Sequence, residues 1–277
     1  MNDLLLVPRI KTAYSYQKLY TTRRVFTLDE QLAEIFGWYL AEGSSCTKSS
    51  EISLTLNVTE FNYACRISGL MRNTIGVKGH IKFIYRKRRG KLEHYIRLRF
   101  YDKDLGKFLI EHFGKKSVIK KIPDFIMYNK DLNIVQKFII AYWKGDGCLS
   151  KKRGIVINTT SKKLALQLQL LMARIGLFLF MKEQPPTKPN ANSFKNKLGI
   201  PYKCHMGYRL QSRDSRVLEY FDVLNTFNKK RATKYYLVDN NYIYVKISNL
   251  SKKEYKCKVY NAETEDHIFM INNVYHT

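Results

Sequence analysis

The feature of this sequence that most restricts its fold is an internal repeat. Residues 35–46 read IFGWYLAEGSSC and residues 138–150 read FIIAYWKGDGCLS, so an apolar run of helical character ends in each case at an acid followed by glycine. Further positions match at a spacing of about a hundred residues: Asn57 with Asn158, Leu70 with Leu171, and Gly76 with Gly176. The chain therefore contains two copies of one unit.

Each copy has the same order of predicted elements. The apolar helix is followed by a strand pair, a helix, a basic hairpin and a last helix, which gives αββαββα. The hairpin connection is short in the first copy, around Arg89 and Gly90, and long in the second, where PPTKPNANSFKNKLGIP supplies turn and loop signals. We predict an α+β fold of two pseudo-symmetric units whose sheets form one saddle, with a small β-rich appendage contributed by both ends of the chain.

The acids that end the two apolar runs, Glu42 and Asp146, predict a metal site. A helix ends in a partial negative charge, so a carboxylate is poorly placed there. Small residues stand four apart in each run and allow two backbones to approach: Gly37 with Ala41, and Ala141 with Gly145. Packed helices would bring both acids to one end, where their charges need a cation. Mg²⁺ suits such a site because it takes one or two carboxylates plus phosphate oxygens and water.

The charge of the chain indicates a polyanionic partner. Lys and Arg number 49 against 23 Asp and Glu, which gives a net charge of +26 and a pI of about 9.8. In the first hairpin the basic side chains alternate with other residues at a spacing of two, so one strand face is basic. For a lone hairpin a solvated face is the simpler explanation, but its repetition favours binding in the DNA major groove. The candidate DNA-binding residues are Lys82, Arg86, Arg88, Arg97, Arg99, Lys182, Arg209 and Arg213.

Composition excludes several classes of protein. Hydrophobic residues make up 45% of the chain, with 20 Tyr and 15 Phe, so it is not a disordered basic tail. The 5 cysteines have no CxxC spacing, which argues against a zinc site or a disulfide framework and predicts reduced core thiols. The first ten residues lack a signal-peptide core and no apolar run is long enough to span a membrane. We expect a cytoplasmic protein associated with nucleoid, organellar or nuclear DNA, with no membrane partner.

These features together resemble the LAGLIDADG homing endonucleases. The nine-residue signature of that family corresponds to residues 35–43 and 139–147. Glu42 departs from the commoner Asp but keeps the carboxylate, and Lys144 stands where the signature has its first Asp, a position without a metal role. The resemblance implies a Mg²⁺ cofactor, for which Mn²⁺ is a possible substitute. The implied metal-binding residues are Glu42, Gly43, Asp146 and Gly147.

A lysine block adds to this resemblance. Residues 115–126 read KKSVIKKIPDFI and resemble the K-x-I-P block that precedes the second signature in intein-borne members, which implies that Lys120 lies near the reacting phosphate. Its counterpart in the second copy lies within FNKKRATK, as Lys229 or Lys230, and no motif decides between them. For each lysine the alternative is a solvated surface charge. The implied catalytic residues are Glu42, Asp146, Lys120, Lys229 and Lys230.

Both ends of the chain carry a second resemblance, to the splicing domain of inteins. The segment NDLLLVPRI looks like the strand that leads from that domain into the endonuclease, and VYNAETEDHIFMINNVYHT looks like the C-terminal splicing block, with His267 and His276 at its two histidines. Splicing needs an opening Cys or Ser and a terminal Asn, whereas this sequence opens at Met1 and has Thr277 after His276. We therefore expect an inert splicing remnant. The predicted domains are residues 1–26 and 236–277 for the two parts of this Hint-like remnant, 27–133 for the first LAGLIDADG unit and 134–235 for the second.

The sequence thus predicts a monomeric, site-specific homing endonuclease that cuts double-stranded DNA by metal-dependent phosphodiester hydrolysis. Its target should be long and asymmetric because the two copies have diverged. Two alternatives stay open. One is a non-cleaving DNA- or RNA-binding protein, such as an intron maturase or a regulator, for which RNA would be a partner. The other is the C-terminal piece of a split intein with a role in protein splicing.

Overall fold

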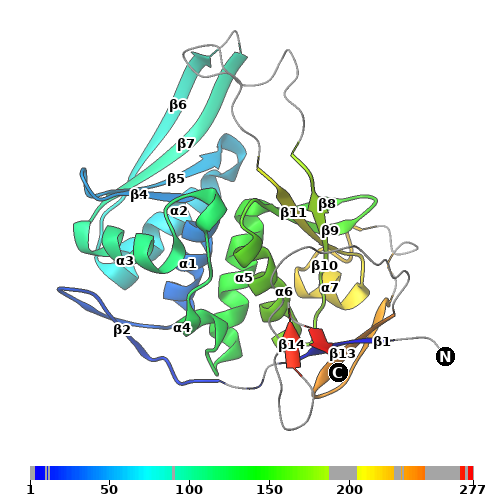
Figure 1. Cartoon of the computed structure of the whole chain (residues 1–277). Helices are drawn as coiled ribbons and strands as arrows, with labels where there is room; N and C mark the ends of the chain where they lie inside the picture. Colours follow the sequence, from blue (N-terminus) through cyan, green and yellow to red (C-terminus); the bar gives the residue numbers. More distant parts are fainter. Residues whose placement is uncertain are drawn as a thin grey trace, which may run out of the picture.

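The computed structural model of this chain describes residues 4–9, 11, 13–88, 91–186, 205–227, 232, 234–246, 269–271 and 274–276. Two units lie side by side, with the hairpin of the first unit projecting beyond the rest (Figure 1). The first unit consists of α1 (Glu30–Glu42), β4 (Gly43–Cys46), β5 (Glu51–Asn57), α2 (Phe61–Leu70), β6 (His80–Arg88), β7 (Lys91–Tyr101) and α3 (Lys103–Phe113). The second consists of α5 (Leu132–Asp146), β8 (Gly147–Ser150), β9 (Gly154–Thr159), α6 (Lys162–Arg174), β10 (Phe180–Gln184), β11 (Gly207–Ser212) and α7 (Ser215–Tyr220). The predicted α+β class and the αββαββα order are confirmed.

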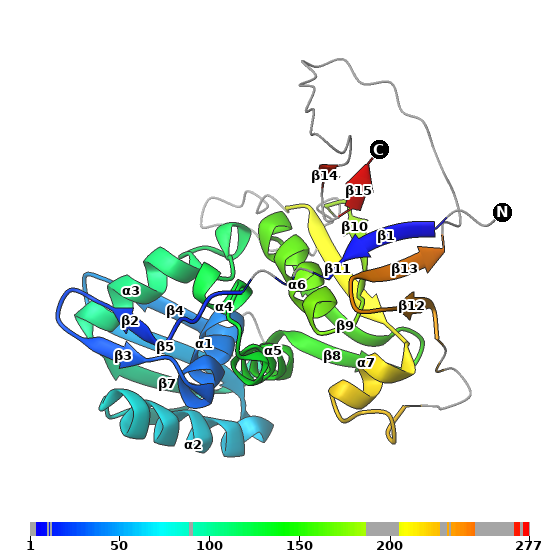
Figure 2. The ribbon, with the colours of Figure 1, turned by 90° about the horizontal axis from the view of Figure 1, so that it is seen from below.

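Each unit has a four-stranded antiparallel sheet with the same order of strands. The orders are β4-β5-β7-β6 and β8-β9-β11-β10. In β7, Ile96, Leu98 and Phe100 are fully buried, whereas Arg97 and Arg99 alternate with them on the other face. The helices cover the apolar faces, and α1 and α5 lie next to each other between the two sheets (Figure 2). In the part of the chain that the structure describes, the helices lie on one side of each sheet, and the polar faces are on the other (Figure 1).

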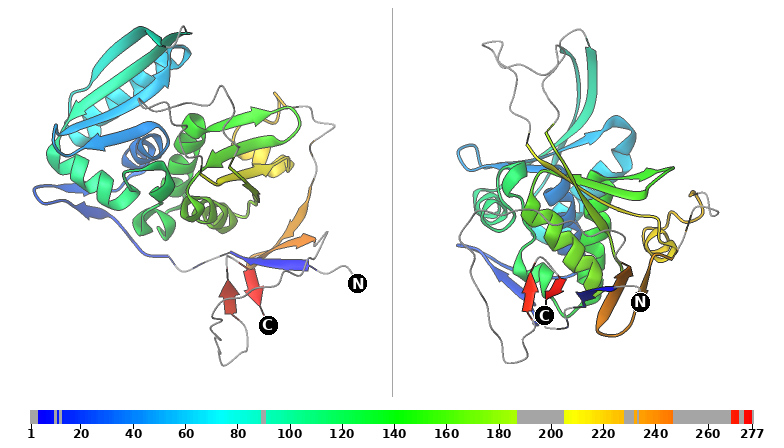
Figure 3. Two further views of the ribbon diagram at one scale, coloured as in Figure 1. Left: turned by 45° about the horizontal axis from the view of Figure 1, so that its top comes forward. Right: turned by 45° about the vertical axis from the view of Figure 1, so that its right-hand side comes forward.

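The two ends of the chain meet in a third sheet. Strand β1 (Leu4–Pro8) pairs with β13 (Tyr242–Lys246), which pairs with β12 (Tyr236–Val238). Val7, Ile243 and Tyr236 pack with Phe178 in a second apolar cluster, so this sheet is attached to the second unit (Figure 3). A hairpin of β14 (Phe269–Ile271) and β15 (Val274–His276) follows, while His267 lies outside the described residues. The intein resemblance and the predicted domain limits stay predictions.

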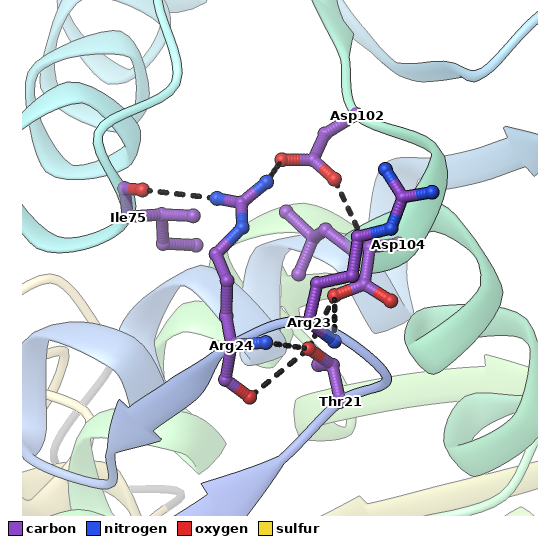
Figure 4. Close-up of polar contacts among 7 residues, drawn as sticks. Thr21, Arg23, Arg24, Ile75, Asp102 and Asp104 are labelled. Carbon is purple, nitrogen blue, oxygen red and sulfur yellow. Dashed lines mark hydrogen bonds and ion pairs between the residues drawn. The ribbon is translucent and has the colours of Figure 1, made fainter.

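A short hairpin near the N-terminus packs on the first unit. Strands β2 (Lys18–Tyr20) and β3 (Val25–Thr27) bury Leu19 and Phe26 in the main core. The turn between β2 and β3 is bonded to two aspartates at the start of α3 (Figure 4). There Arg24 forms an ion pair with Asp102, which also accepts a hydrogen bond from the amide of Leu105 at 2.9 Å and so caps α3. Asp104 accepts hydrogen bonds from the hydroxyl of Thr21 and, at 3.3 Å, from the amide of Arg23.

The cysteines differ from the expectation. Cys46, Cys65 and Cys148 are free and exposed, so the prediction of core thiols is wrong for these three. The reason is local: Cys46 and Cys148 lie on the outward side of the short strands β4 and β8, and Cys65 lies on the solvent face of α2. Cys204 and Cys257 lie outside the described residues.

No helix in the described ranges is both long and apolar enough to cross a lipid bilayer. The longest of the signature helices, α5, has 15 residues.

Candidate active site at the ends of the two signature helices

The helices α1 and α5 pack against each other through their small residues. A Cβ atom added at Gly37 would lie 2.4 Å from the carbonyl oxygen of Phe138 and 2.7 Å from the Cβ of Ala141. A Cβ atom added at Gly145 would lie 2.6 Å from the Cβ of Ala41. Distances this short mean that the two backbones are in direct contact. The close approach predicted from the spacing of small residues is therefore confirmed.

This packing brings the two predicted acids together. Glu42 ends α1 and Asp146 ends α5, and an added Cβ at Gly145 would lie 3.2 Å from the Cγ of Glu42. Burial raises the pKa of Glu42 to about 7, and the negative charge of Asp146 adds to this increase. Burial also raises the pKa of Asp146 to about 6, against the lowering effect of Lys120. Two partly buried carboxylates at two negative helix ends form a site that favours a cation.

Lys120 reaches the same place from the segment that connects the two units. Its Nζ donates hydrogen bonds to the carbonyl oxygens of Leu40, at 2.5 Å, and Ala41, at 2.9 Å, in the last turn of α1. Burial lowers the pKa of Lys120, while the charges of Asp146 and Glu42 oppose that shift. The structure thus brings together three of the five predicted catalytic residues. Lys229 and Lys230 lie outside the described residues.

The donor set fits a divalent cation of the Mg²⁺ type. The described ranges contain no group of three or more His, Cys, Asp or Glu that could hold a metal ion, so no all-protein cage is found in them. Glu42 and Asp146 offer two carboxylates, and Mg²⁺ ordinarily completes such a pair with water and phosphate oxygens. We conclude that these two residues are suited to holding the metal, with the other ligands supplied by substrate and solvent.

Gly43 and Gly147 follow the two acids and start β4 and β8 directly. A Cβ atom at Gly43 would lie 2.4 Å from the carbonyl oxygen of Tyr39, and one at Gly147 would lie 2.4 Å from that of Trp143. The glycines therefore let each chain turn sharply from helix into strand. Their predicted role as metal ligands through the backbone stays a prediction.

The polar face of the first sheet carries the predicted arginines, and two of them are paired with glutamates. Arg86 forms an ion pair with Glu93 at 2.7 Å, and Arg99 lies 3.7 Å from Glu51. Arg97 donates a hydrogen bond to the hydroxyl of Tyr95 at 3.2 Å. Lys82 is exposed and lies opposite Arg97 in the register, whereas the side chain of Arg88 lies outside the described part of the chain. Sequence reasoning missed the two glutamates. Glu93 lies on the same face of β7 as Arg97 and Arg99, at the spacing of two that marks a strand, and Glu51 lies on the neighbouring strand β5.

The second sheet carries a corresponding set of basic residues. Lys182 lies opposite Arg209, whose Nε donates a hydrogen bond to the amide oxygen of Asn158 at 3.4 Å. Arg213 donates to the hydroxyl of Tyr235. Arg213 also lines a cavity of about 420 Å³ with Lys152 and Arg153 of the β8–β9 turn. Sequence reasoning missed these two turn residues, although adjacent cations in a strand connection were a usable signal.

The fold and the site together define a class of protein. A protein of this class has two αββαββα units. The first helix of each unit ends in a carboxylate, the two carboxylates share one site, and each unit has a sheet with a cationic face. Residues 133–255 match the family described as "LAGLIDADG-like domain". The second unit therefore matches a LAGLIDADG-like domain, which confirms the resemblance to that family.

The chain is also similar to segments of curated proteins. It is 26% identical over 246 residues to an uncharacterised protein of Methanocaldococcus jannaschii. The matched region covers 86% of this chain and 28% of that protein. It is also 26% identical over 285 residues to the ATP-dependent DNA helicase Hel308 of Thermococcus kodakarensis. The matched region covers 96% of this chain and 23% of that protein. The chain thus spans about a quarter of the length of these relatives.

The chain is also similar, with TM-scores below 0.5, to two solved structures. One is the homing endonuclease I-DmoI in complex with DNA and Mn, with a TM-score of 0.46, 14% identity, and coverage of 72% of this chain and 98% of that one. The other is the homing endonuclease I-WcaI bound to its DNA recognition sequence, with a TM-score of 0.47, 15% identity, and coverage of 75% and 88%.

Proposed function

We propose that this chain is a divalent-metal-dependent homing endonuclease that cuts both strands of a duplex DNA target. The observation that carries the proposal is the pair of partly buried carboxylates, Glu42 and Asp146, held at one place by two helices in backbone contact. Without a bound cation, Lys120 alone would offset the charges of two acids placed at two negative helix ends.

In this proposal the chain's own groups bind the metal and the phosphate. Glu42 and Asp146 would hold Mg²⁺, or Mn²⁺ in its place, and a metal ion held there would supply Lewis-acid activation of water and charge stabilisation at phosphorus. Lys120 supplies a further positive charge to the phosphate. An ammonium group has three donors. Two of those on Lys120 are directed to the carbonyls of Leu40 and Ala41, so the third can reach a phosphate oxygen.

The two sheets would read two different half-sites. Strands β6 and β7 have 9 and 11 residues, whereas β10 and β11 have 5 and 6. Strand pairs of such different length present different surfaces to the two halves of a DNA site. We therefore propose an asymmetric target. Because one chain supplies both signature helices, we also propose that a monomer is sufficient for cleavage of both strands.

A cleavage assay on a randomised duplex library tests this function. With Mg²⁺ or Mn²⁺, a restricted set of long sites should be cut, and EDTA should stop the reaction. The variant Asp146→Asn serves as the matched inactive control. Binding to duplex DNA without cleavage in either metal would overturn the nuclease and would favour the binding-only alternative, with RNA competition then separating a maturase from a DNA regulator.

Binding to duplex DNA is expected to depend steeply on salt. If the two cationic faces neutralise on the order of ten phosphates, log K should fall against log salt with a slope near about −9. The measurement is a fluorescence titration in EDTA at several salt concentrations, so that no cleavage interferes. A slope shallower than about −3 would contradict binding by the cationic faces of the sheets.

Replacing Arg97 with Gln should weaken DNA binding. Arg97 lies on the exposed face of β7 and bonds only to Tyr95 among the contacts of the described residues. A contact to a base edge would cost about 1–3 kcal/mol and relax specificity at one position, whereas a phosphate contact would weaken all sequences alike and make the salt slope shallower by about 1. Arg66→Gln is the control, because Arg66 lies on α2 and pairs with Glu34. Equal binding by both variants and the parent would exclude Arg97 from the interface.

A further inference from the structure

The segment that carries Lys120 is held in place by α6 of the second unit. The hydroxyl of Ser161 donates a hydrogen bond to the carbonyl oxygen of Lys120 at 2.6 Å. The side-chain amide of Gln167 makes two hydrogen bonds to Ile122: its oxygen accepts from the amide at 2.8 Å, and its nitrogen donates to the carbonyl oxygen at 2.7 Å. The residues on the two sides of Lys121 are therefore bonded to the N-cap residue of α6 and to the helix itself.

This contact is not a general property of the repeated unit. With Leu70 matched to Leu171, the position equivalent to Gln167 in the first unit is Arg66. Arg66 does not bond to a connecting segment; its guanidinium makes two hydrogen bonds to the carboxylate of Glu34 on α1, at 2.5 and 2.6 Å. The hydrogen bonds between Gln167 and Ile122 are thus present in the second unit and have no counterpart at the equivalent position of the first unit.

We propose that Gln167 and Ser161 are positioning residues for Lys120. They act across the boundary between the units: α6 of the second unit fixes the backbone at residues 120 and 122, and the lysine stem then extends to the last turn of α1. A lysine side chain is long and flexible, so the position of its ammonium depends on a fixed backbone at residue 120 as well as on the hydrogen bonds to Leu40 and Ala41. The inference rests on the proposed function, because Lys120 acts on DNA only if the chain cleaves it.

The proposal predicts an effect on one strand. In the proposed function Lys120 acts at one of two reacting phosphates, and both hydrogen bonds that the Gln167 side chain makes among the described residues go to the segment that carries this lysine. In Gln167→Met, which is similar in size but cannot make the two hydrogen bonds, the ammonium loses its fixed position. A misplacement of about 1 Å in a catalytic arrangement costs about 100-fold in rate. We therefore expect one strand to be cut about 10- to 100-fold more slowly, unchanged affinity for DNA, and accumulation of nicked duplex.

Single-turnover cleavage of a duplex with a different label on each strand provides the measurement. Gln169→Met is the matched control, because Gln169 lies on the same helix and donates a single hydrogen bond to the carbonyl oxygen of Leu179 at 2.9 Å, away from Lys120. This control should cut both strands at the parental rates. In a Lys120→Met background, Gln167→Met should cause no further loss, because the residue it positions is already absent. Equal slowing of both strands, or full additivity with Lys120→Met, would overturn the proposal.

Amide hydrogen exchange gives a readout that does not depend on cleavage. In metal-free protein, the amide of Ile122 should exchange faster in Gln167→Met than in the parent or in Gln169→Met, since its acceptor is removed. If the parent chain cuts no DNA, the proposed function fails, whatever the exchange result. If the parent cuts DNA and the Ile122 amide is released, but both strands are still cut at the parental rates, the positioning role alone is wrong.

Discussion

Replacing Asp146 with Asn, or Glu42 with Gln, is expected to reduce DNA cleavage by roughly three orders of magnitude or more. Each change removes an anionic metal ligand while nearly preserving shape. Binding of DNA should persist, because in the proposed function these side chains face the phosphates and would repel them in the absence of metal. In EDTA the affinity for DNA should be unchanged or higher in both variants.

The measurement is single-turnover cleavage with Mg²⁺, together with a binding titration in EDTA. Asp131→Asn provides a matched control: it makes the same substitution at the opposite end of α5, where Asp131 caps the helix by accepting a hydrogen bond from the amide of Asn133 at 2.9 Å. Asn caps a helix about as well as Asp, so this variant should cut at the parental rate. A chain lacking both carboxylates that still cut DNA at the parental rate would eliminate the mechanism.

Replacing Gly37 with Ala is expected to destabilise the protein and to reduce cleavage. The added Cβ would lie 2.4 Å from the carbonyl oxygen of Phe138, which is backbone and cannot move unless the helices separate. Such overpacking costs about 1–3 kcal/mol in free energy of unfolding. Separation of α1 from α5 would also move Glu42 relative to Asp146, and a shift of about 1 Å would lower the cleavage rate by about 100-fold.

Gly69→Ala is the matched control for this substitution. Gly69 lies in α2, and no atom lies within 4 Å of an added Cβ. The same change should therefore raise the free energy of unfolding by about 0.4–1 kcal/mol, because alanine restricts the unfolded chain. Urea denaturation of both variants measures whether the free energy of unfolding falls for Gly37→Ala and rises for Gly69→Ala. A stabilised Gly37→Ala variant would show that the helices are not in the close contact described above.

Much of the candidate site was predictable from the sequence. The repeat, the element order and the position of Glu42 and Asp146 at the ends of apolar helices follow from local periodicity, which depends on neighbours within a few residues. The small residues Gly37 and Gly145 also predicted that the two helices touch, since only such residues allow backbones to meet. Assignment of Lys120 to the reacting phosphate came from family resemblance and not from physical pattern.

Only the tertiary structure decided which groups these residues meet. Arg86 and Arg99 are paired with glutamates, and the sequence alternation that made both arginines candidates gives no information about cross-strand partners until the register is fixed. Lys120 bonds to a carbonyl 80 positions away, and Gln167 bonds to Ile122 across 45 positions. Contacts at such separations depend on how α1, α5 and α6 pack together, and that packing is set by the whole core and not by any single segment.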